Sequence, residues 1–262
     1  MKPTLFRIAA LTFALSIALV APGSAQDDEF SWSGHIAQGR TIEIKNANGP
    51  LFAEYTSGDQ VEVTAVKDGP DSDREEVSIE VVEHDGGVTI CSIYPNSWTS
   101  RNRCAPGDEG HIGSNKNKTK VTFTIRVPAG VRLVAKTMNG KIAVQGLQSN
   151  VEVMTMNGAI TVSTSGWARA KTMNGAIEAH LGATDWTGDL ELETMNGAVT
   201  VYLPADANAE VNASTMNGKV DSDWSLKKSG WLRNKAHGTI GSGGRRLEIS
   251  TMNGSIRIRR AS

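Results

Sequence analysis

The chain of 262 residues carries 27 lysines and arginines against 28 aspartates and glutamates, for a formal net charge of −1. Removal of a leader that contains Lys2 and Arg7 takes away two positive charges and leaves −3, which disfavours a nucleic-acid partner. With 27 glycines and only 5% aromatic residues, the chain is suited to many tight turns around a thin core, and few of its segments have helical character.

The first 25 residues have the composition of a secretory signal peptide. Lys2 and Arg7 form a basic start before an apolar run at residues 8–20. Small residues at 23–25 follow, so cleavage is expected near Ala25. The run is too short for a membrane span and no later stretch is apolar enough to cross a bilayer, so we predict no transmembrane anchor. The mature protein is therefore expected to be extracytoplasmic, either periplasmic or secreted.

Residues 26–262 are expected to form a single all-β domain of repeated strands. Alternation of apolar and polar side chains predicts strands at 39–44, 61–66, 77–81 and 88–90. Phe30 and Trp32 precede the first of these strands. Their aromatic side chains are expected either to cover the open end of the strand array or to lie on a mobile terminus.

Residues 91–120 interrupt this alternation and are predicted to form a long loop. Its two cysteines, Cys91 and Cys104, are expected to form a disulfide, because the chain carries an export signal. Long loops with aromatic and arginine side chains often form binding surfaces, and the alternative is a stapled surface loop without a partner. The candidate interaction residues of this loop are Trp98, Arg101 and Arg103.

One tetrapeptide, Thr-Met-Asn-Gly, occurs six times between residues 137 and 254, and its copies start 17 to 36 residues apart. Recurrence at about 20 residues is typical of stacked coils, in which each repeat is one turn of the chain. Apolar residues alternate on both sides of each copy, so each copy is expected to join two strands that share one buried face. The threonines, asparagines and glycines of the six copies are Thr137, Asn139, Gly140, Thr155, Asn157, Gly158, Thr172, Asn174, Gly175, Thr194, Asn196, Gly197, Thr215, Asn217, Gly218, Thr251, Asn253 and Gly254.

These repeats predict a β-solenoid, similar to a parallel β-helix, built from Thr-Met-Asn-Gly turns. If each turn lies over the last at about 4.8 Å, asparagine amides bond to asparagine amides and threonine hydroxyls to threonine hydroxyls in continuous ladders. Stacked in chain order, the asparagine ladder ends at Asn253. The alternative is a sandwich of antiparallel hairpins, because Asn-Gly is also a strong hairpin signal. That alternative gives no reason for the recurring threonine and methionine.

Residues 221–246 separate the last two copies and are interpreted as an insertion that forms a lid or a cap. Trp224 and Trp231 in this segment are further candidate interaction residues. The segment also holds His237 near Ser242, the nearest approach in the chain to a serine nucleophile beside a base. Because serine is common in glycine-rich loops, we interpret this pair as structural and predict no catalytic residue.

No set of side chains in the sequence predicts a metal or cofactor site. The five histidines are isolated, and none belongs to a zinc motif. The methionines of the six repeats have the opposite parity to the buried valines. They are expected to pack against each other or under a loop, and a soft metal such as Cu(I) is the alternative ligand. Asp185 and Asp189 flank Trp186, which would serve a carbohydrate enzyme as a sugar platform, but the two aspartates are interpreted as turn residues.

In these features the chain resembles the putative adhesins, a family of bacterial exported β-strand-repeat proteins (domain of unknown function 4097) related to head domains with Gly-Ile-Asn-like turns. The resemblance covers about residues 30–260 and rests on the signal peptide, the Thr-Met-Asn-Gly units, the Pro-Ala-Gly corner at 128–130, the two-cysteine loop and the glycine-rich segment 238–244. It implies a solenoid-like fold and a surface or cell-envelope role. It carries over no catalytic residue.

We therefore expect an exported, non-enzymatic, adhesin-like scaffold that interacts with an envelope, glycan or protein ligand and needs no cofactor. The alternative is a carbohydrate-active β-helix enzyme, a polysaccharide lyase or hydrolase, because such enzymes also stack asparagine ladders. Grouped Asp, Glu and Arg side chains in one groove would favour the enzyme. Thr, Asn and apolar ladders without an acidic cleft would favour the scaffold.

Overall fold

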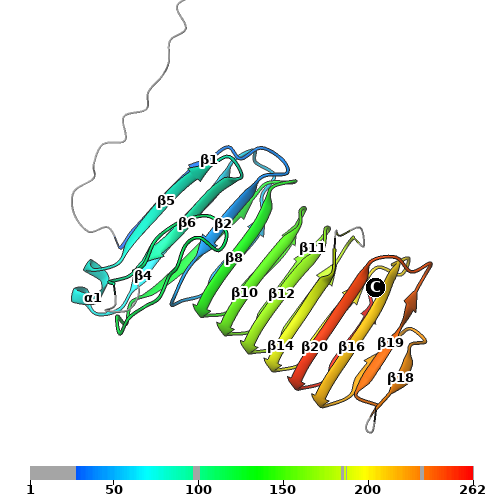
Figure 1. Cartoon of the computed structure of the whole chain (residues 1–262). Coiled ribbons are helices and arrows are strands. Elements are labelled where there is room, and N and C mark those ends of the chain that lie inside the picture. The colour runs from blue at the N-terminus through cyan, green and yellow to red at the C-terminus, as the bar shows by residue number, and fades with distance from the viewer. Residues whose placement is uncertain (1–27, 97–100, 184–185, 187, 231–232, 262) are drawn as a thin grey trace, which may run out of the picture.

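The computed structural model describes residues 28–96, 101–183, 186, 188–230 and 233–261. The predicted signal peptide (residues 1–25) and the candidate residues Trp98 and Trp231 lie outside this part of the chain. The described residues form two long β-sheets and one short helix, α1 (Asp71–Glu75) (Figure 1). Among them, no helix is both long enough and apolar enough to span a membrane.

The strands of the two sheets do not follow chain order. The ten-stranded sheet has the order β1 (Glu29–Gly34), β4 (Val61–Asp68), β7 (Lys120–Val127), β3 (Leu51–Tyr55), β9 (Ile142–Leu147), β11 (Ile160–Thr164), β13 (Ile177–Leu181), β15 (Val199–Leu203), β21 (Ile256–Arg260) and β17 (Val220–Ser222). The eleven-stranded sheet has the order β18 (Lys227–Ser229), β19 (Lys235–Ile240), β16 (Ala209–Asn217), β20 (Arg246–Asn253), β14 (Leu190–Asn196), β12 (Ala168–Asn174), β10 (Val151–Asn157), β8 (Arg132–Asn139), β2 (Thr41–Lys45), β6 (Gly87–Ile93) and β5 (Ser78–His84).

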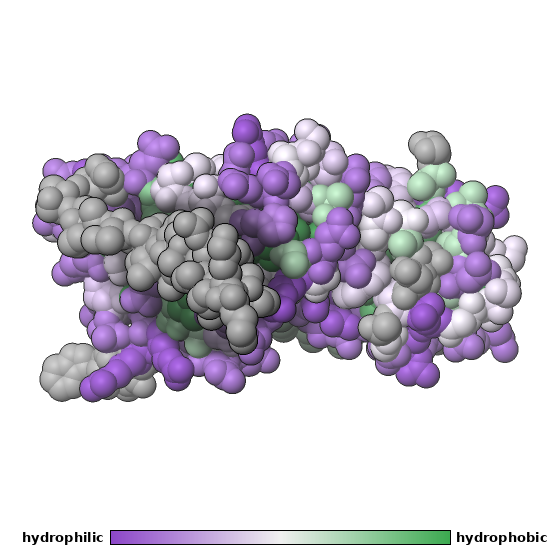
Figure 2. Space-filling view, turned by 90° about the horizontal axis from the view of Figure 1, so that it is seen from above, coloured by the Kyte–Doolittle hydropathy of each residue, from purple (hydrophilic) through white to green (hydrophobic). Residues whose placement is uncertain are grey.

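Each coil in the body of the molecule gives one strand to each sheet. β10 belongs to the eleven-stranded sheet and its successor β11 to the ten-stranded sheet, so the Asn-Gly turn at 157–158 passes from one sheet to the other. Val151 and Val153 before this turn, and Ile160 and Val162 after it, are buried in the core. Hydrophilic residues cover most of the outer surface in Figure 2, and hydrophobic residues lie there in small separate areas. The alternating pattern of the sequence therefore builds a thin apolar layer between two sheets.

Neighbouring coils pair in parallel across this body. β10 pairs in parallel with β8 and β12, and β14 pairs in parallel with β12 and β20. Among the described strands, antiparallel pairs occur at the two ends, where β4 pairs with β1 and β7, β5 with β6, and β19 with β16 and β18. The fold is all-β and solenoid-like. The hairpin sandwich is wrong for the body, because its Asn-Gly turns connect strands of different sheets.

The asparagines of the repeats form a continuous ladder of side-chain hydrogen bonds. The Nδ2 of every member except Asn139 donates to the Oδ1 of the asparagine on an adjoining coil, at 2.7–2.8 Å. In spatial order the members are Asn139, Asn157, Asn174, Asn196, Asn253 and Asn217. Because β20 lies between β14 and β16 (Figure 1), the prediction that Asn253 ends the ladder is wrong, and Asn217 is the last member.

The segment 221–246 accounts for this change of order. It adds strands to the ends of both sheets, since β17 pairs with β21, and β19 pairs with the outer edge of β16. The chain then returns along β20 into the position between β16 and β14. Parallel neighbours require only a crossover connection of sufficient length, so the spatial order of coils is free to differ from the chain order.

The threonines of the repeats are buried, but they do not bond to one another. Thr155 Oγ1 donates to the carbonyl oxygen of Gly140 at 3.0 Å, and Thr172 Oγ1 donates to that of Gly158 at 3.0 Å. The equivalent bond occurs in all six copies, at 2.8–3.2 Å. The predicted threonine-to-threonine ladder is therefore wrong. The hydroxyl instead donates to the turn carbonyl of the adjoining coil. Burial of that carbonyl without a hydrogen-bond donor would be costly.

Successive turns approach so closely that the fourth residue of the repeat must lack a side chain. A Cβ atom on Gly175 would lie 2.0 Å from the carbonyl oxygen of Gly158, and one on Gly197 would lie 2.0 Å from that of Gly175. None of the six repeat glycines has a left-handed backbone. Glycine is thus required for the close approach of two coils, and not for the positive φ that a two-residue hairpin turn needs.

The two ends of the molecule are protected in different ways. Phe30 and Trp32 in β1 are partly buried against the core at one end, so these aromatic side chains cover the strand array. At the other end, β18 has three exposed residues, two of which are Lys227 and Lys228. A short edge strand with charged side chains resists pairing with another chain.

Substitution of Gly175 by alanine is expected to lower the free energy of unfolding by about 3 kcal/mol, because the added methyl group forces two stacked turns apart. Urea denaturation measures the loss. Gly58→Ala is the control, since Gly58 lies in an exposed bend where a Cβ atom meets nothing closer than 3.5 Å. Its effect is expected to stay within about 0.5 kcal/mol. Equal effects of the two substitutions would contradict the requirement for close approach.

A second prediction concerns position within the asparagine ladder. Asn174→Ala removes two ladder bonds and is expected to cost about 1 kcal/mol, whereas Asn217→Ala removes one and is expected to cost about half as much. Asn253→Ala should resemble Asn174→Ala, because Asn253 bonds to neighbours on both sides. Chemical denaturation of the three variants ranks these costs. A ranking in which Asn253 behaves as the end of the ladder would contradict the observed strand order.

Candidate interaction surface

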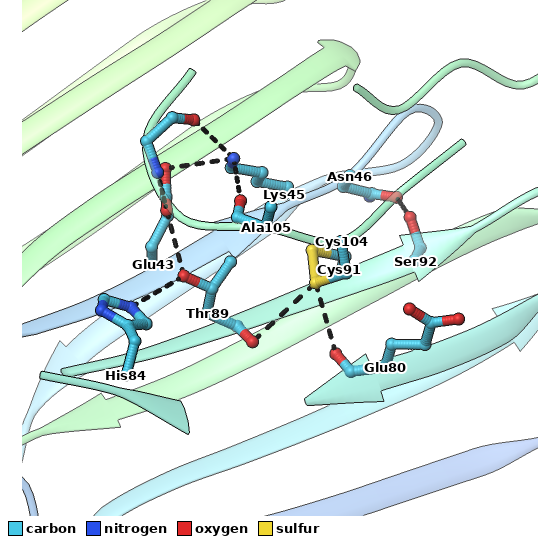
Figure 3. The surroundings of a disulfide bond; sticks show 11 residues. Glu43, Lys45, Asn46, Glu80, His84, Thr89, Cys91, Ser92, Cys104 and Ala105 are labelled. Atoms are coloured by element: carbon cyan, nitrogen blue, oxygen red, sulfur yellow. Dashed lines mark hydrogen bonds and ion pairs between the residues drawn. A yellow bond between two sulfur atoms is a disulfide. The ribbon is translucent and has the colours of Figure 1, made fainter. Parts of the chain in front are cut away.

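The disulfide loop folds over the outer face of the eleven-stranded sheet. Cys91 in β6 is joined to Cys104, with an S–S distance of 1.97 Å, as the sequence predicts. Figure 3 shows that the segment after Cys104 passes above β2, where Ala105 lies against the side chain of Lys45. Further along the loop, Asp108 lies 3.4 Å from Lys136 Nζ in β8. The loop is therefore attached to the sheet both covalently and by polar contacts.

A buried pair of opposite charges fixes the loop to β2. Lys45 Nζ donates to the carbonyl oxygens of Ala105 and Gly107, each at 2.5 Å, and lies 3.7 Å from Glu43 Oε1. The other oxygen, Glu43 Oε2, accepts from Thr89 Oγ1 at 3.1 Å and from the Gly107 N–H at 2.9 Å. Only 5% of the Lys45 side chain and 6% of the Glu43 side chain are exposed. Lys136 Nζ also lies 3.3 Å from Glu43 Oε1, but this lysine is more exposed than Lys45. Loss of Lys45 is therefore costly, because two carbonyls lose their buried donor and Glu43 keeps only the more exposed cation.

A histidine extends this network at its far side. His84 Nδ1 accepts from the Gly86 N–H at 3.1 Å, so Nε2 is assigned the proton and donates to Thr89 Oγ1 at 3.2 Å. Thr89 in turn donates to Glu43 (Figure 3). This chain of hydroxyl, imidazole and carboxylate has the composition of a catalytic site. Thr89 is completely buried, however, so its hydroxyl acts as a structural bridge.

Sequence reasoning missed Glu43 and Lys45 because they occupy the outward parity of their strand. Alternation predicts exposure for both side chains, and β2 itself presents them on the outer face of the sheet. Their burial comes from a loop that begins more than 45 residues later in the chain. The only available signal was the pair of cysteines, which shows that the loop returns to β6 but not which strands it covers.

A groove of about 360 Å³ lies between the loop and the sheet. The loop side is lined by His111 and Ile112, and the sheet side by Met138, Met154 and Met156. Met138 and Met156 stand on neighbouring strands, because Thr137 pairs with Thr155 and the next residues follow in register. The sheet side of the groove thus combines three methionines with the polar side chains of Lys45 and Lys136.

The repeat methionines continue from the groove as a row across the outer face, which we call the methionine row. Its members in spatial order are Met138, Met156, Met173, Met195, Met252 and Met216. Met138 is partly buried, and the other five are 39–62% exposed. Exposed apolar side chains that gather in one place commonly mark interaction sites. The predicted parity, opposite to the buried valines, is what places them all on this face.

The structure does not bring the candidate aromatic and arginine side chains together. Arg101 and Arg103 are exposed on the disulfide loop. Trp224 belongs to the segment between β17 and β18, at the other end of the molecule, and is partly buried against the core. The Arg260 guanidinium lies 5.4 Å from its ring centre. Trp224 therefore covers the end of the core and does not join the groove.

The features that would serve an enzyme are used structurally. Trp186 is fully buried and donates from Nε1 to the Arg246 carbonyl at 3.0 Å, so a role as sugar platform is wrong. Asp185 lies outside the described residues. Ser242 Oγ donates to Asn208 Oδ1 at 2.9 Å, and this contact occupies the hydroxyl that His237 would need to activate. Among the described residues, no group of three or more His, Cys, Asp or Glu side chains could hold a metal ion.

The outer carboxylates are neutralised by basic partners. A hydrogen bond from Lys171 lowers the pKa of Glu191, and Arg259, which donates at 2.7 Å, lowers the pKa of Asp221. A general acid that works near neutral pH requires a carboxyl with a raised pKa. These two groups are therefore unsuited to donate a proton to a glycosidic oxygen.

Basic side chains gather at the end of the molecule opposite the groove. Lys219, Lys228, Arg233 and Arg257 line a hollow of about 640 Å³ together with the carboxylate of Asp221. We call this region the basic hollow. It contrasts with the weakly negative charge of the whole chain.

The two sheets, the parallel coils and the in-register turns define a solenoid-like all-β protein. The model of a family described as Toastrack DUF4097 matches residues 130–259, which include all six Thr-Met-Asn-Gly turns. The chain belongs to the DUF4097 family. No curated protein matches the chain.

Three solved structures are similar to the chain at low sequence identity. A putative cell adhesion protein from Clostridium sporogenes is 12% identical, with 89% of this chain and 100% of that chain covered and a TM-score of 0.44. A putative adhesin from Bacteroides fragilis is 14% identical, with 89% and 97% covered and a TM-score of 0.24. A putative lipid binding protein from Parabacteroides distasonis is 12% identical, with 88% and 96% covered and a TM-score of 0.25. These values assign no ligand to the present chain.

Replacement of Lys45 by methionine is expected to lower the free energy of unfolding at neutral pH by about 3 kcal/mol, because Glu43 and two carbonyls lose a buried partner. Burial lowers the pKa of Lys45 below its ordinary value of 10.5, and the attraction of Glu43 only partly opposes this. Between the lowered pKa and 10.5, the unfolded chain binds a proton that the folded chain does not. The Lys45 contribution to stability therefore rises with pH in this window.

Denaturation of the wild type and of Lys45→Met at a series of alkaline pH values checks this sign. The difference in unfolding free energy between them is expected to grow as the pH rises toward 10.5. Lys227→Met is the control, since Lys227 is exposed on β18 and its loss should change neither the stability nor the pH dependence. Parallel pH profiles for the wild type and Lys45→Met would contradict the buried charge.

Proposed function

We propose that the chain is an exported adhesin-like scaffold, a β-solenoid built from Thr-Met-Asn-Gly turns, which binds a protein partner and has no enzymatic activity. The partner lies against the outer face of the eleven-stranded sheet, with apolar side chains in the groove and along the methionine row. The observation that supports this proposal is the row itself, in which five exposed methionines and the partly buried Met138 lie on one face and lead into one groove.

Methionine is suited to a protein surface of this kind. Its thioether side chain is flexible and polarisable, so a row of methionines adapts to different apolar side chains. A glycan, in contrast, is usually held by open aromatic rings. In the described part of the chain, Trp167 is partly buried with Arg132 5.9 Å from its ring, and Tyr202 is stacked on His180 at 4.1 Å. These two rings are occupied, and the exposed ring of Tyr55 stands on the other sheet, which favours a protein ligand at the methionine row over a glycan or other envelope polymer.

The charges beside the row support apolar recognition. Arg132 Nη2 lies 2.7 Å from Glu152, and Lys171 Nζ lies 3.4 Å from Glu193. Both pairs stand on the same outer face as the methionines. In each pair the basic side chain neutralises the carboxylate. The flanks of the row therefore offer little net charge to a partner, and exposed pairs of this kind contribute little energy of their own.

The export of the chain is part of the same proposal. Cleavage near Ala25 would release residues 26–262 as one domain into the periplasm or the medium. The leader pattern of residues 1–25 supports this route. The disulfide between Cys91 and Cys104 supports it as well, because such bonds persist in oxidising compartments.

A carbohydrate-active enzyme is the second candidate because His237 and Glu248 line one hollow of about 340 Å³. Both residues pair in register with Asn212, one from each side, so Asn212 lies between the imidazole and the carboxylate. Release of new sugar ends from polysaccharides by the purified chain, abolished in His237→Ala, would favour this reading over the scaffold.

The scaffold proposal is tested by the binding of labelled protein to isolated bacterial envelopes. The groove variant carries Met138→Ser, Met154→Ser and Met156→Ser and is expected to bind at least about tenfold more weakly, since buried apolar anchors dominate interface energy. The control carries Tyr55→Ser and Val66→Ser, which remove exposed apolar side chains from the other sheet. The control is expected to bind as the wild type does.

Protease treatment of the envelopes distinguishes the ligand classes. Binding to a protein partner is lost after treatment, whereas binding to a glycan survives it and is competed by free polysaccharide. Equal weakening of the groove variant and the control, or binding that survives protease, would reject the proposed surface or its proposed partner.

A further inference from the structure

The six Asn-Gly pairs of the repeats share one covalent reaction. The backbone nitrogen after an asparagine can attack the side-chain amide carbon, and glycine hinders this attack least because it has no side chain. We propose that Asn217 is the site at which this reaction, deamidation through a succinimide, takes place in the folded protein. The stacked coils protect the other five asparagines.

In five copies, the nitrogen that would attack is already held. The N–H of Gly158 donates to the Asn174 carbonyl at 2.9 Å, and the N–H of Gly175 donates to the Asn196 carbonyl at 2.9 Å. The same bond, at 2.9–3.1 Å, holds Gly140, Gly197 and Gly254. Gly218 follows the last asparagine of the ladder, and no further Asn-Gly turn of the described residues stacks on it. Residues 233–234 flank this turn instead, since the Thr215 N–H donates to the Asn234 carbonyl at 2.9 Å and the Val220 N–H donates to the Arg233 carbonyl at 3.3 Å. In the described ranges, no carbonyl accepts from its N–H.

The side chain of Asn217 is also less restrained than those inside the ladder. An interior member such as Asn174 makes two ladder bonds, one as donor and one as acceptor. Asn217 donates to Asn253 at 2.7 Å, and no described side chain donates to its Oδ1. Asn217 is exposed. Rotation of its amide toward the Gly218 nitrogen therefore breaks one ladder bond where an interior asparagine would break two.

The reaction needs no reagent other than water. The Gly218 nitrogen loses its proton to solvent base and forms a bond to Cγ of Asn217. The bond between Cγ and Nδ2 then breaks, and the amide nitrogen leaves as ammonia. Water opens the five-membered succinimide at either carbonyl, which leaves an aspartate or an isoaspartate at position 217. The product adds a negative charge two residues before Lys219, which lines the basic hollow.

The test is incubation of the folded protein at mildly alkaline pH, followed by mass spectrometry of the peptides that contain each Asn-Gly pair. Asn139 is the matched control, because it is the other end of the ladder and a lysine likewise follows its glycine. Its glycine N–H, however, bonds to the Asn157 carbonyl at 2.9 Å. We expect deamidation at Asn217 to be at least about tenfold faster than at Asn139, since that bond must open before attack.

Two further samples separate the effect of structure from that of sequence. In denaturant the six pairs are expected to react at similar rates, because no stacked coil remains. Asn217→Gln keeps an amide at the ladder end but cannot form the five-membered ring, so it should abolish the fast reaction and leave the other five sites unchanged. A folded-state rate at Asn217 no higher than at Asn139, or a preference for Asn217 that persists in denaturant, would overturn the proposal.

Discussion

The contact between the glycines of successive turns sets the geometry on which the rest of the structure depends. A Cβ atom at any of the six repeat glycines would lie 1.9–2.1 Å from a glycine carbonyl oxygen of the adjoining coil. This approach brings each carbonyl within reach of a buried threonine hydroxyl and each asparagine within reach of the next asparagine. Three residues of the repeat therefore serve the stack itself. The methionine is the member that faces outward, so the repeat can vary its surface without any change in its interior.

Much of this arrangement could be predicted from the sequence. The period-two alternation identified the strands and their buried faces, the recurring tetrapeptide indicated stacked turns, and two cysteines behind a predicted export signal indicated their disulfide. The partner of each threonine could not be predicted, because hydroxyl direction depends on how far a turn carbonyl projects toward the next coil. The position of β20 between β14 and β16 could not be predicted either. The alternation of a strand indicates which of its faces is buried, but not which strands lie beside it.

The groove likewise could not be predicted from the alternation of the strands alone. Met154 and Met156 have a parity that predicts exposure, and the structure confirms it. What covers one side of them is a loop whose own sequence has no regular pattern. The prediction for Trp186 was wrong in the opposite sense. An aromatic residue between turn signals suggested an exposed sugar platform, but the side chain is buried in the core. Local patterns thus predict which side of a strand a residue occupies, and tertiary contacts decide whether that side meets solvent.

The groove is lined by residues from inside and from outside the region that the family model matches. Residues 130–259 supply its methionines, whereas His111 and Ile112 come from the loop that precedes this region. The coils provide the methionines at the base of the groove, and the loop determines its shape. Variation at His111 and Ile112 would alter the shape of the groove without any change in the coils.

The position of β20 has a consequence for how the chain acquires its structure. β14 and β16 both pair with a strand that follows them in the sequence, so neither can complete its edge until residues 246–253 have been synthesised. If β16 paired with β14 first, it would occupy the place of β20 and leave that strand without a partner. Long-range pairing of this kind is slow and exposes unpaired strand edges to other chains. The facing edges of β14 and β16 thus stay open to misassembly until β20 arrives between them.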